Sequence, residues 1–141
     1  MSWVHDNIIA SYLVDFANER LLLKTQYYDE SEICENIDVI FEGYWAHRFE
    51  HEQPGSIIFD IEECAPARFY ESEHELFEKN RNHCWPIAYQ TPDTRTELMK
   101  FMRDNGYKVF EILSSLGLCG WVISQRMEIV VSEAARPPAG P

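Results

Sequence analysis

Two histidines and three nearby carboxylates are the first residues of this chain that could do chemistry. His47 and His51 stand at the end of a segment of alternating apolar residues, and Asp60, Glu62 and Glu63 follow a short turn later. Imidazole nitrogens and carboxylate oxygens are common ligands of zinc and iron. Alternation, however, places His47 with the apolar side chains and sends Asp60 and Glu62 to the opposite side of a strand. We therefore expect no bound metal or other cofactor, and a small metal-dependent hydrolase built on these residues stays an alternative function.

A cysteine in a glycine-rich connection is the second candidate. Cys119 lies in the segment Gly117-Leu118-Cys119-Gly120, which superficially resembles a tight turn that carries a nucleophile. A thiol at such a turn becomes reactive when a base or a helix N-terminus lowers its pKa. The sequence identifies no such base, and the segment leads into a strand. We expect a hairpin connection here and no catalytic residue in the chain.

Acidic residues that cluster around the expected turns are the third candidate. Their carboxylates could take the place of phosphates on a basic surface of another protein, as partners for its Arg and Lys side chains. A tyrosine beside the first acidic loop would add contact area. The residues expected to contact a partner are Tyr28, Asp29, Glu30, Glu32, Glu35, Glu50, Glu52, Glu62 and Glu63.

The net charge favours this third candidate. The chain has a formal net charge of -12, and residues 1–80 hold 18 Asp and Glu against 5 Lys and Arg. A negative field repels nucleic acid and anionic lipid and increases the encounter rate with basic partners. We therefore expect a basic protein partner, and neither a nucleic acid nor a membrane. Because no signal peptide or apolar run of about 20 residues is recognisable, a cytoplasmic location is expected.

The composition predicts one domain. A chain of 141 residues with 45% hydrophobic and 26% charged residues is an ordinary globular sequence of single-domain size. The four cysteines lack the paired spacing of a metal or redox motif, so reduced thiols are expected. We place the domain at residues 1–133 and a flexible proline-rich tail at residues 134–141.

Hydrophobic periodicity predicts the elements that position these candidates. Strands are expected at residues 8–16, 20–28, 36–50, 56–62, 107–115 and 121–131, and helices at residues 66–82 and 94–105. Consecutive strands would form three hairpins. Strands that precede and follow a pair of helices favour an α+β fold, with the order ββββααββ. We expect one antiparallel sheet of about six strands with both helices packed on one face.

Four motifs carry a loose resemblance to known proteins. They are His5-Asp6-Asn7, the segment from Gly55 to Glu63 (GSIIFDIEE), Trp85-Pro86, and the hairpin Gly117-Leu118-Cys119-Gly120-Trp121. Together they resemble a family of small uncharacterised bacterial proteins of about this length, and some such families resemble immunity proteins of toxin systems. That resemblance implies a protein that neutralises a toxin by binding it, and it implies no catalytic residue.

The sequence therefore predicts a non-enzymatic, acidic protein-binding module that is immunity-like and docks a basic partner electrostatically. The metal-dependent hydrolase described above is one alternative. A structural homodimer formed through an exposed sheet edge is another.

Overall fold

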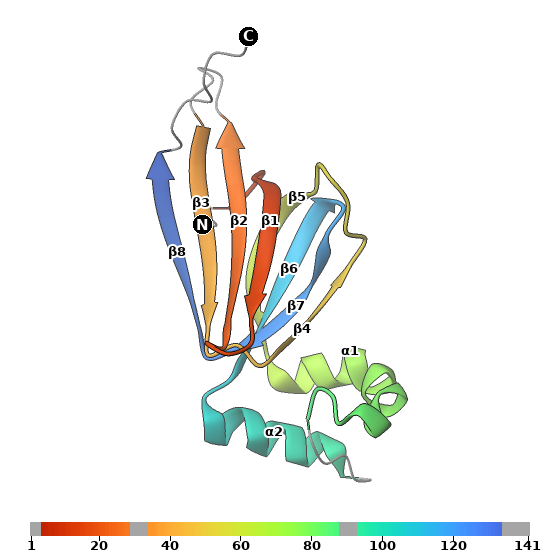
Figure 1. Cartoon of the computed structure of the whole chain (residues 1–141). Helices are drawn as coiled ribbons and strands as arrows, with labels where there is room; N and C mark the ends of the chain where they lie inside the picture. The colour runs from red at the N-terminus through yellow and green to blue at the C-terminus, as the bar shows by residue number, and fades with distance from the viewer. Residues whose placement is uncertain (1–3, 29–33, 88–92, 134–141) are drawn as a thin grey trace.

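The computed structural model describes residues 4–28, 34–87 and 93–133, which form one antiparallel sheet and two α-helices (Figure 1). The strands are β1 (Ile8–Asp15), β2 (Arg20–Tyr28), β3 (Cys34–Glu42), β4 (Ala46–Glu50), β5 (Ile57–Cys64), β6 (Lys108–Leu116), β7 (Cys119–Ser124) and β8 (Arg126–Glu133). The helices are α1 (Pro66–Lys79) and α2 (Thr94–Asn105), with a short 3-10 helix, η1 (Arg81–His83), after α1. The predicted α+β class is confirmed.

The predicted number of six strands is wrong, because two long strands are each divided by a bend. The sheet has eight strands in the order β4-β7-β6-β5-β1-β2-β3-β8, so the chain runs as five strands, two helices and three strands. The segment predicted at residues 36–50 breaks after Glu42, where Gly43 has a φ of 64°, and the segment predicted at 121–131 breaks at Gln125. The two bends meet, since the Gln125 amide donates to the carbonyls of Glu42 and Gly43.

Only two of the three predicted hairpins form. The first joins β1 to β2 and the last joins β6 to β7, as expected. The second predicted hairpin, between residues 36–50 and 56–62, does not exist, because β4 pairs with β7 while β5 pairs with β6 and, through Ile8 and Ile57, with β1. β4 and β5, which follow each other in the sequence, are therefore separated in the sheet by β6 and β7.

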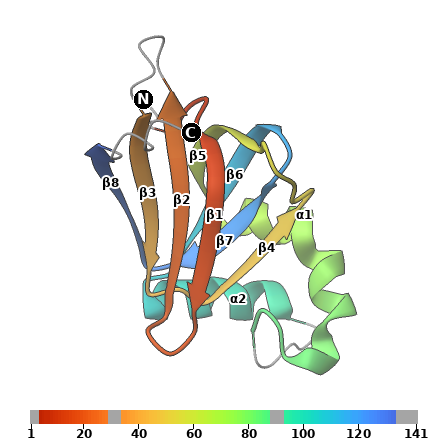
Figure 2. The ribbon, with the colours of Figure 1, turned by 45° about the horizontal axis from the view of Figure 1, so that its top comes forward.

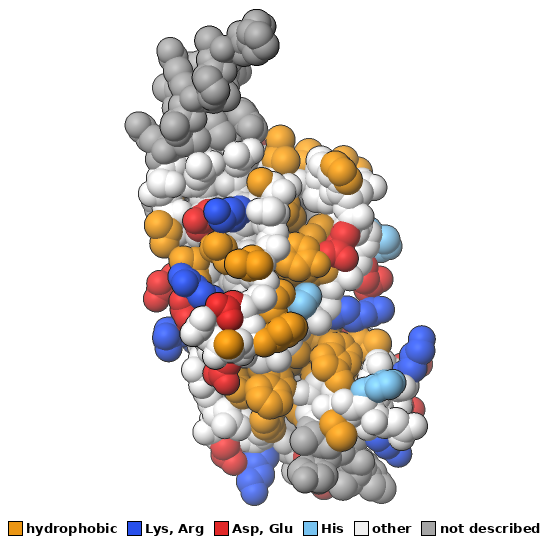
Figure 3. Space-filling model, viewed as in Figure 1, with side chains coloured by type: hydrophobic (Ala, Val, Ile, Leu, Met, Phe, Trp, Pro, Cys, Tyr) orange, Lys and Arg blue, Asp and Glu red, His pale blue; other side chains and the backbone are white. Residues whose placement is uncertain are grey.

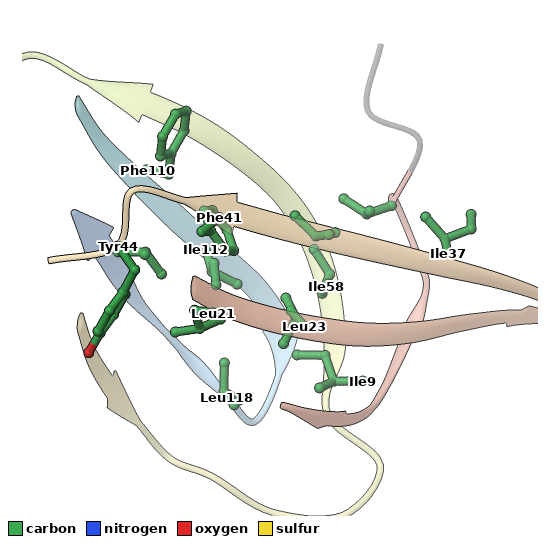
Figure 4. Close-up of a cluster of buried hydrophobic side chains, with 13 residues drawn as sticks. Ile9, Leu21, Leu23, Ile37, Phe41, Tyr44, Ile58, Phe110, Ile112 and Leu118 are labelled. Carbon is green, nitrogen blue, oxygen red and sulfur yellow. The ribbon is translucent and has the colours of Figure 1, made fainter. Parts of the chain in front are cut away.

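The sheet curls so that its two halves face each other across a core. Strands β1, β2, β3 and β8 form one half, and β4, β5, β6 and β7 form the other (Figure 2). Leu21, Leu23 and Phe41 of the first half lie against Ile58 and Ile112 of the second (Figure 4). All are buried because the alternate side chains of each strand point to this interior.

A second apolar layer lies between the second half of the sheet and the helices. Phe69 and Phe77 of α1 and Leu98 of α2 pack with Trp121 and Ile123 of β7. Both helices thus cover one face, on the side of the second half-sheet away from the interior core. Helix α2 ends as predicted at Gly106, which takes a φ of 68°. Helix α1 ends at Lys79, before the predicted end at residue 82, and Cys84 beyond it is exposed.

Bulges interrupt the regular alternation of buried and exposed side chains in β1 and β5. A register shift between Ile9 and Ser11 buries Ile9 and leaves Ala10 exposed. Shifts on both sides of Ile58 bury that residue and expose Phe59. Each extra residue reverses the direction of the side chains that follow it.

Candidate functional site

The predicted acidic residues do not all come together. Glu35 lies near the start of β3 in the first half of the sheet, whereas Glu50 and Glu52, at and after the end of β4, and Glu62 and Glu63, in β5, belong to the second half. The register pairs Arg48 with Trp121, Trp121 with Glu111 and Glu111 with Glu62, so Glu50 lies only two residues along its strand from the level of Glu62. The predicted contact residues Asp29, Glu30 and Glu32 lie outside the described residues, and Tyr28 is described only as the last backbone position of β2.

Several of these carboxylates already have partners within the chain. Glu50 lies 2.8 Å from Arg48, which is also 3.6 Å from Glu73 of α1. Glu63 lies 3.7 Å from Lys108. Glu62 faces another carboxylate, since its register partner across β5 and β6 is Glu111. The ion pairs neutralise part of the negative charge at these positions.

The two candidate metal histidines have different surroundings. His47 points to the interior side of β4, where its Nδ1 lies 2.7 Å from the Tyr44 hydroxyl and its ring contacts Tyr12 and Phe49. Burial lowers the pKa of His47, and the negative charge of Glu52 partly opposes that shift. The neutral form is therefore favoured, with the Tyr44 O–H donating to Nδ1 when the ring proton is on Nε2. Burial raises the pKa of Tyr44 to about 12, so this hydroxyl keeps its proton.

His51 instead contacts the thiol of Cys119, the candidate nucleophile for which the sequence identifies no base. The Nδ1 atom of His51 lies 3.6 Å from Sγ of Cys119, although the two residues are 68 positions apart in the chain. Their approach follows from the pairing of β4 with β7, in which Glu50 is the register partner of Cys119. Within the described ranges no group of three or more His, Cys, Asp or Glu side chains is placed to hold a metal ion.

An aromatic band that sequence reasoning missed runs along the opening between β1 and β4. Tyr12 of β1 packs edge-on against Phe49, with ring centroids 5.0 Å apart, and His47 lies between them and Tyr44. Phe16, in the turn after β1, lies 6.2 Å from the Tyr44 ring and is 76% exposed. The opening exists because β1 pairs with β5 only at its first residue, and aromatic side chains cover the interior core there.

A second aromatic cluster continues the band toward α2. Trp45, between β3 and β4, contacts the rings of Phe101 and Tyr107 at 5.2 and 5.8 Å and donates its indole N–H to the carbonyl of Pro86. The Trp45 side chain nevertheless stays 41% exposed. We call Tyr12, Phe16, Tyr44, Trp45, His47, Phe49, Phe101 and Tyr107 the aromatic band.

Carboxylates border the aromatic band. Glu52 accepts a hydrogen bond from the Tyr12 hydroxyl, and Asp15 directly precedes Phe16. Glu19 lies close enough to Tyr107 to contribute, after burial, to the raised pKa of that phenol. Figure 3 shows the face that contains β1 and β4, with hydrophobic side chains gathered between these strands and down toward α2, and with acidic side chains beside them.

A sheet edge is the remaining surface feature. Among the described residues, β8 is the last strand of the order and pairs with β3 alone. Val130 and Val131 on this strand are 47% and 45% exposed. Such an edge presents unpaired backbone groups that another strand could bind.

The comparisons with known proteins add no family to these observations. The chain matches no protein-family model, and neither the curated proteins nor the solved structures gave a significant match. Among the described residues, no helix has the length and apolar character needed to cross a membrane.

Proposed function

We propose that this chain is a non-enzymatic protein-binding module that docks a basic partner on the aromatic band. The observation that carries the proposal is the coincidence, on one face, of a border of carboxylates with an aromatic band whose members Phe16 and Trp45 are exposed. Tyrosine, tryptophan and phenylalanine are enriched in the cores of protein interfaces, where they supply most of the binding energy. Asp15, Glu19 and Glu52 would pair with Arg or Lys side chains around that core.

The charge of the whole chain supports a basic partner. A net charge of -12 attracts cationic surfaces over long distances and repels other acidic proteins. The acidic border would then fix the orientation of the partner, while the aromatic band would provide the affinity. Neutralisation of a basic toxin, as in an immunity protein, is the activity that we propose for such a surface.

Two exposed residues of the same region provide a matched test. Phe16 belongs to the aromatic band, whereas Leu13, which is 65% exposed, lies between the inward-packed Tyr12 and Val14 and points to the outer face of the sheet. Phe16→Ser and Leu13→Ser remove similar apolar side chains from opposite faces. Neither side chain is needed to fill the core.

The experiment is affinity capture from a lysate of the native source, followed by measurement of the dissociation constant for any stoichiometric partner. We expect wild type and Leu13→Ser to bind one basic protein, and Phe16→Ser to bind it about 30-fold more weakly, the loss typical of an interface hot spot. Raising the salt concentration should weaken binding by all variants. Loss of binding by Leu13→Ser with retention by Phe16→Ser, an acidic partner, or affinity that ignores salt would contradict the proposal.

Sedimentation of the purified protein separates this proposal from the alternative of a structural homodimer. A protein-binding module of the proposed kind is a monomer before it meets its partner. If the wild-type protein is a stable dimer and the variant Val130→Lys, changed on the edge strand β8, is a monomer, the homodimer is favoured instead.

A further inference from the structure

We propose that Cys119 and His51 form a thiol-modification site that reacts with small cationic disulfides. The two side chains come from β7 and from the segment after β4, and the 3.6 Å separation between Sγ and Nδ1 allows direct proton transfer between them. This is the base that a reactive cysteine requires. The site does not depend on the docking function of the aromatic band.

Three contacts position the segment that carries His51, and one of them joins it to the hairpin that carries Cys119. The buried hydroxyl of Ser56 donates to the Gln53 carbonyl at 2.7 Å and accepts from the Leu118 amide at 2.9 Å. Glu52 is fixed by the Tyr12 hydroxyl. The backbone of His51 has a φ of 56°, a conformation that residues other than glycine rarely adopt. The imidazole is therefore positioned by the surrounding structure rather than placed by a flexible loop.

Close packing of the backbone brings the two strands together at this point. A Cβ atom on Gly120 would lie 1.9 Å from the carbonyl oxygen of Arg48, so only glycine permits this approach of β7 to β4. Cys119, the first residue of β7, is partly exposed, so an electrophile can reach it from solvent. Cys64, in contrast, is buried, and burial raises the pKa of its thiol to about 11.

The reaction is thiol–disulfide exchange. The thiol proton of Cys119 passes to Nδ1 of His51, and the thiolate attacks one sulfur of a disulfide R–S–S–R. A new bond forms between Cys119 Sγ and one R–S group while the original S–S bond breaks. The other R–S⁻ leaves with the electron pair and takes the proton back from the imidazolium. The cysteine is oxidised and one half of the small disulfide is reduced, so no further oxidant is needed.

The charges around the pair select the substrate. Glu50 is the register partner of Cys119 and Glu52 follows His51, while Arg48 is shared between Glu50 and Glu73. Together, the side chains of Glu50, Glu52, Glu73 and Arg48 carry a net negative charge, which concentrates cations near the thiol. Disulfides with ammonium groups should therefore react faster than those with carboxylates.

The test measures rates of mixed-disulfide formation on the full chain at neutral pH, with peptide mass mapping to separate Cys119 from the exposed Cys84. The probes are cystamine, which is cationic, bis(2-hydroxyethyl) disulfide, which is neutral, and 3,3′-dithiodipropionate, which is anionic. We expect Cys119 to react faster than Cys84, and its rates to fall in the order of the probes given. The spread between the probes should shrink at high salt.

His51→Asn is the decisive variant, because asparagine tolerates a positive φ but offers no base. We expect the rate at Cys119 to fall about tenfold or more and the rate at Cys84 to stay unchanged. Equal thermal unfolding of the two proteins shows that the fold is intact. An unchanged rate at Cys119 in His51→Asn, or a wild-type rate at Cys119 no higher than at Cys84, would overturn the inference. Faster reaction with the anionic probe would overturn the assigned substrate class.

Discussion

At the scale of single residues, His47 shows how burial determines the chemistry of an ionisable side chain. The imidazole lies against Tyr12, Tyr44 and Phe49, where the charged form loses its hydration. Its lowered pKa means that the folded protein binds this proton less readily than the unfolded chain does. A histidine in such a position acts as a hydrogen-bond acceptor for Tyr44 and covers the core.

We therefore predict that His47 titrates below 6.5, the ordinary value for histidine. As the pH falls below about 6.5, the unfolded chain takes up a proton before the folded protein does, so the free energy of unfolding should decrease until the pH reaches the folded pKa. Titration of the imidazole by NMR and denaturant unfolding between about pH 4.5 and 8 measure both effects. The variant His47→Gln should lose this part of the pH dependence. A pKa at or above 6.5 would contradict the placement of the ring.

At the scale of elements, the contact between β4 and β7 is the feature on which the thiol pair depends. Gly120 has a φ of 151° and lies directly against the backbone of Arg48 and Phe49. Because the obstructing atoms belong to the main chain, they cannot move aside as a flexible side chain would.

We predict that Gly120→Ala lowers the free energy of unfolding by about 2–3 kcal/mol, the range for steric overpacking inside a protein. Gly106→Ala at the end of α2 is the matched control, because Gly106 has a φ of 68° with no atom within 4 Å of the added Cβ. The control should lose only about 1 kcal/mol, which is the cost of the left-handed conformation. Urea unfolding measures both. Equal losses would show that the strands do not approach as closely as described.

Local patterns in the sequence were sufficient to predict the elements but not their pairing. The hairpin of β1 and β2 follows from the alternation of neighbouring residues, and the end of α2 follows from the cap residue Gly106. Both depend only on residues a few positions apart. The pairing of β4 with β7 joins residues about 70 positions apart, and no local preference encodes it. Apolar alternation continues through Gly43, so the local pattern predicts one strand where the structure has two.

The candidate sites were missed for the same reason. Cys119 was recognised as a potential nucleophile, but its base, His51, approaches only through that long-range pairing. The aromatic band likewise combines side chains of β1, β4 and α2, which are far apart in the sequence. The predicted acidic contact residues that the structure describes are divided between β3 in one half of the sheet and the region of β4 and β5 in the other.

At the scale of the whole molecule, two apolar layers share one half of the sheet. In β7, Val122 points to the interior core while Trp121 and Ile123 point to the helices. In β6, Phe110 likewise points to the interior core, while Val109 points to the helices. Neither layer can lose its packing without disturbing strands that the other layer needs, so the domain should unfold as one cooperative unit.

We predict that Leu98→Ala in α2 lowers the global stability by about 2–5 kcal/mol, because it opens a cavity at a fully buried position. Native-state hydrogen exchange should show an equal loss of protection in the most stable amides of α2 and of β2, on the far side of the interior core. Loss of protection confined to α2 would show that the helical layer opens independently of the sheet.

The free edge of β8 has a consequence for how the protein behaves in concentrated solution. Identical molecules that each carry a charge of -12 keep one another at a distance, and this repulsion guards the valine-bearing strand against templated addition of a second copy. Added electrolyte shortens the reach of that repulsion. Buffers rich in salt, which would loosen a complex with a cationic protein, should therefore favour edge-to-edge aggregation of the free chain.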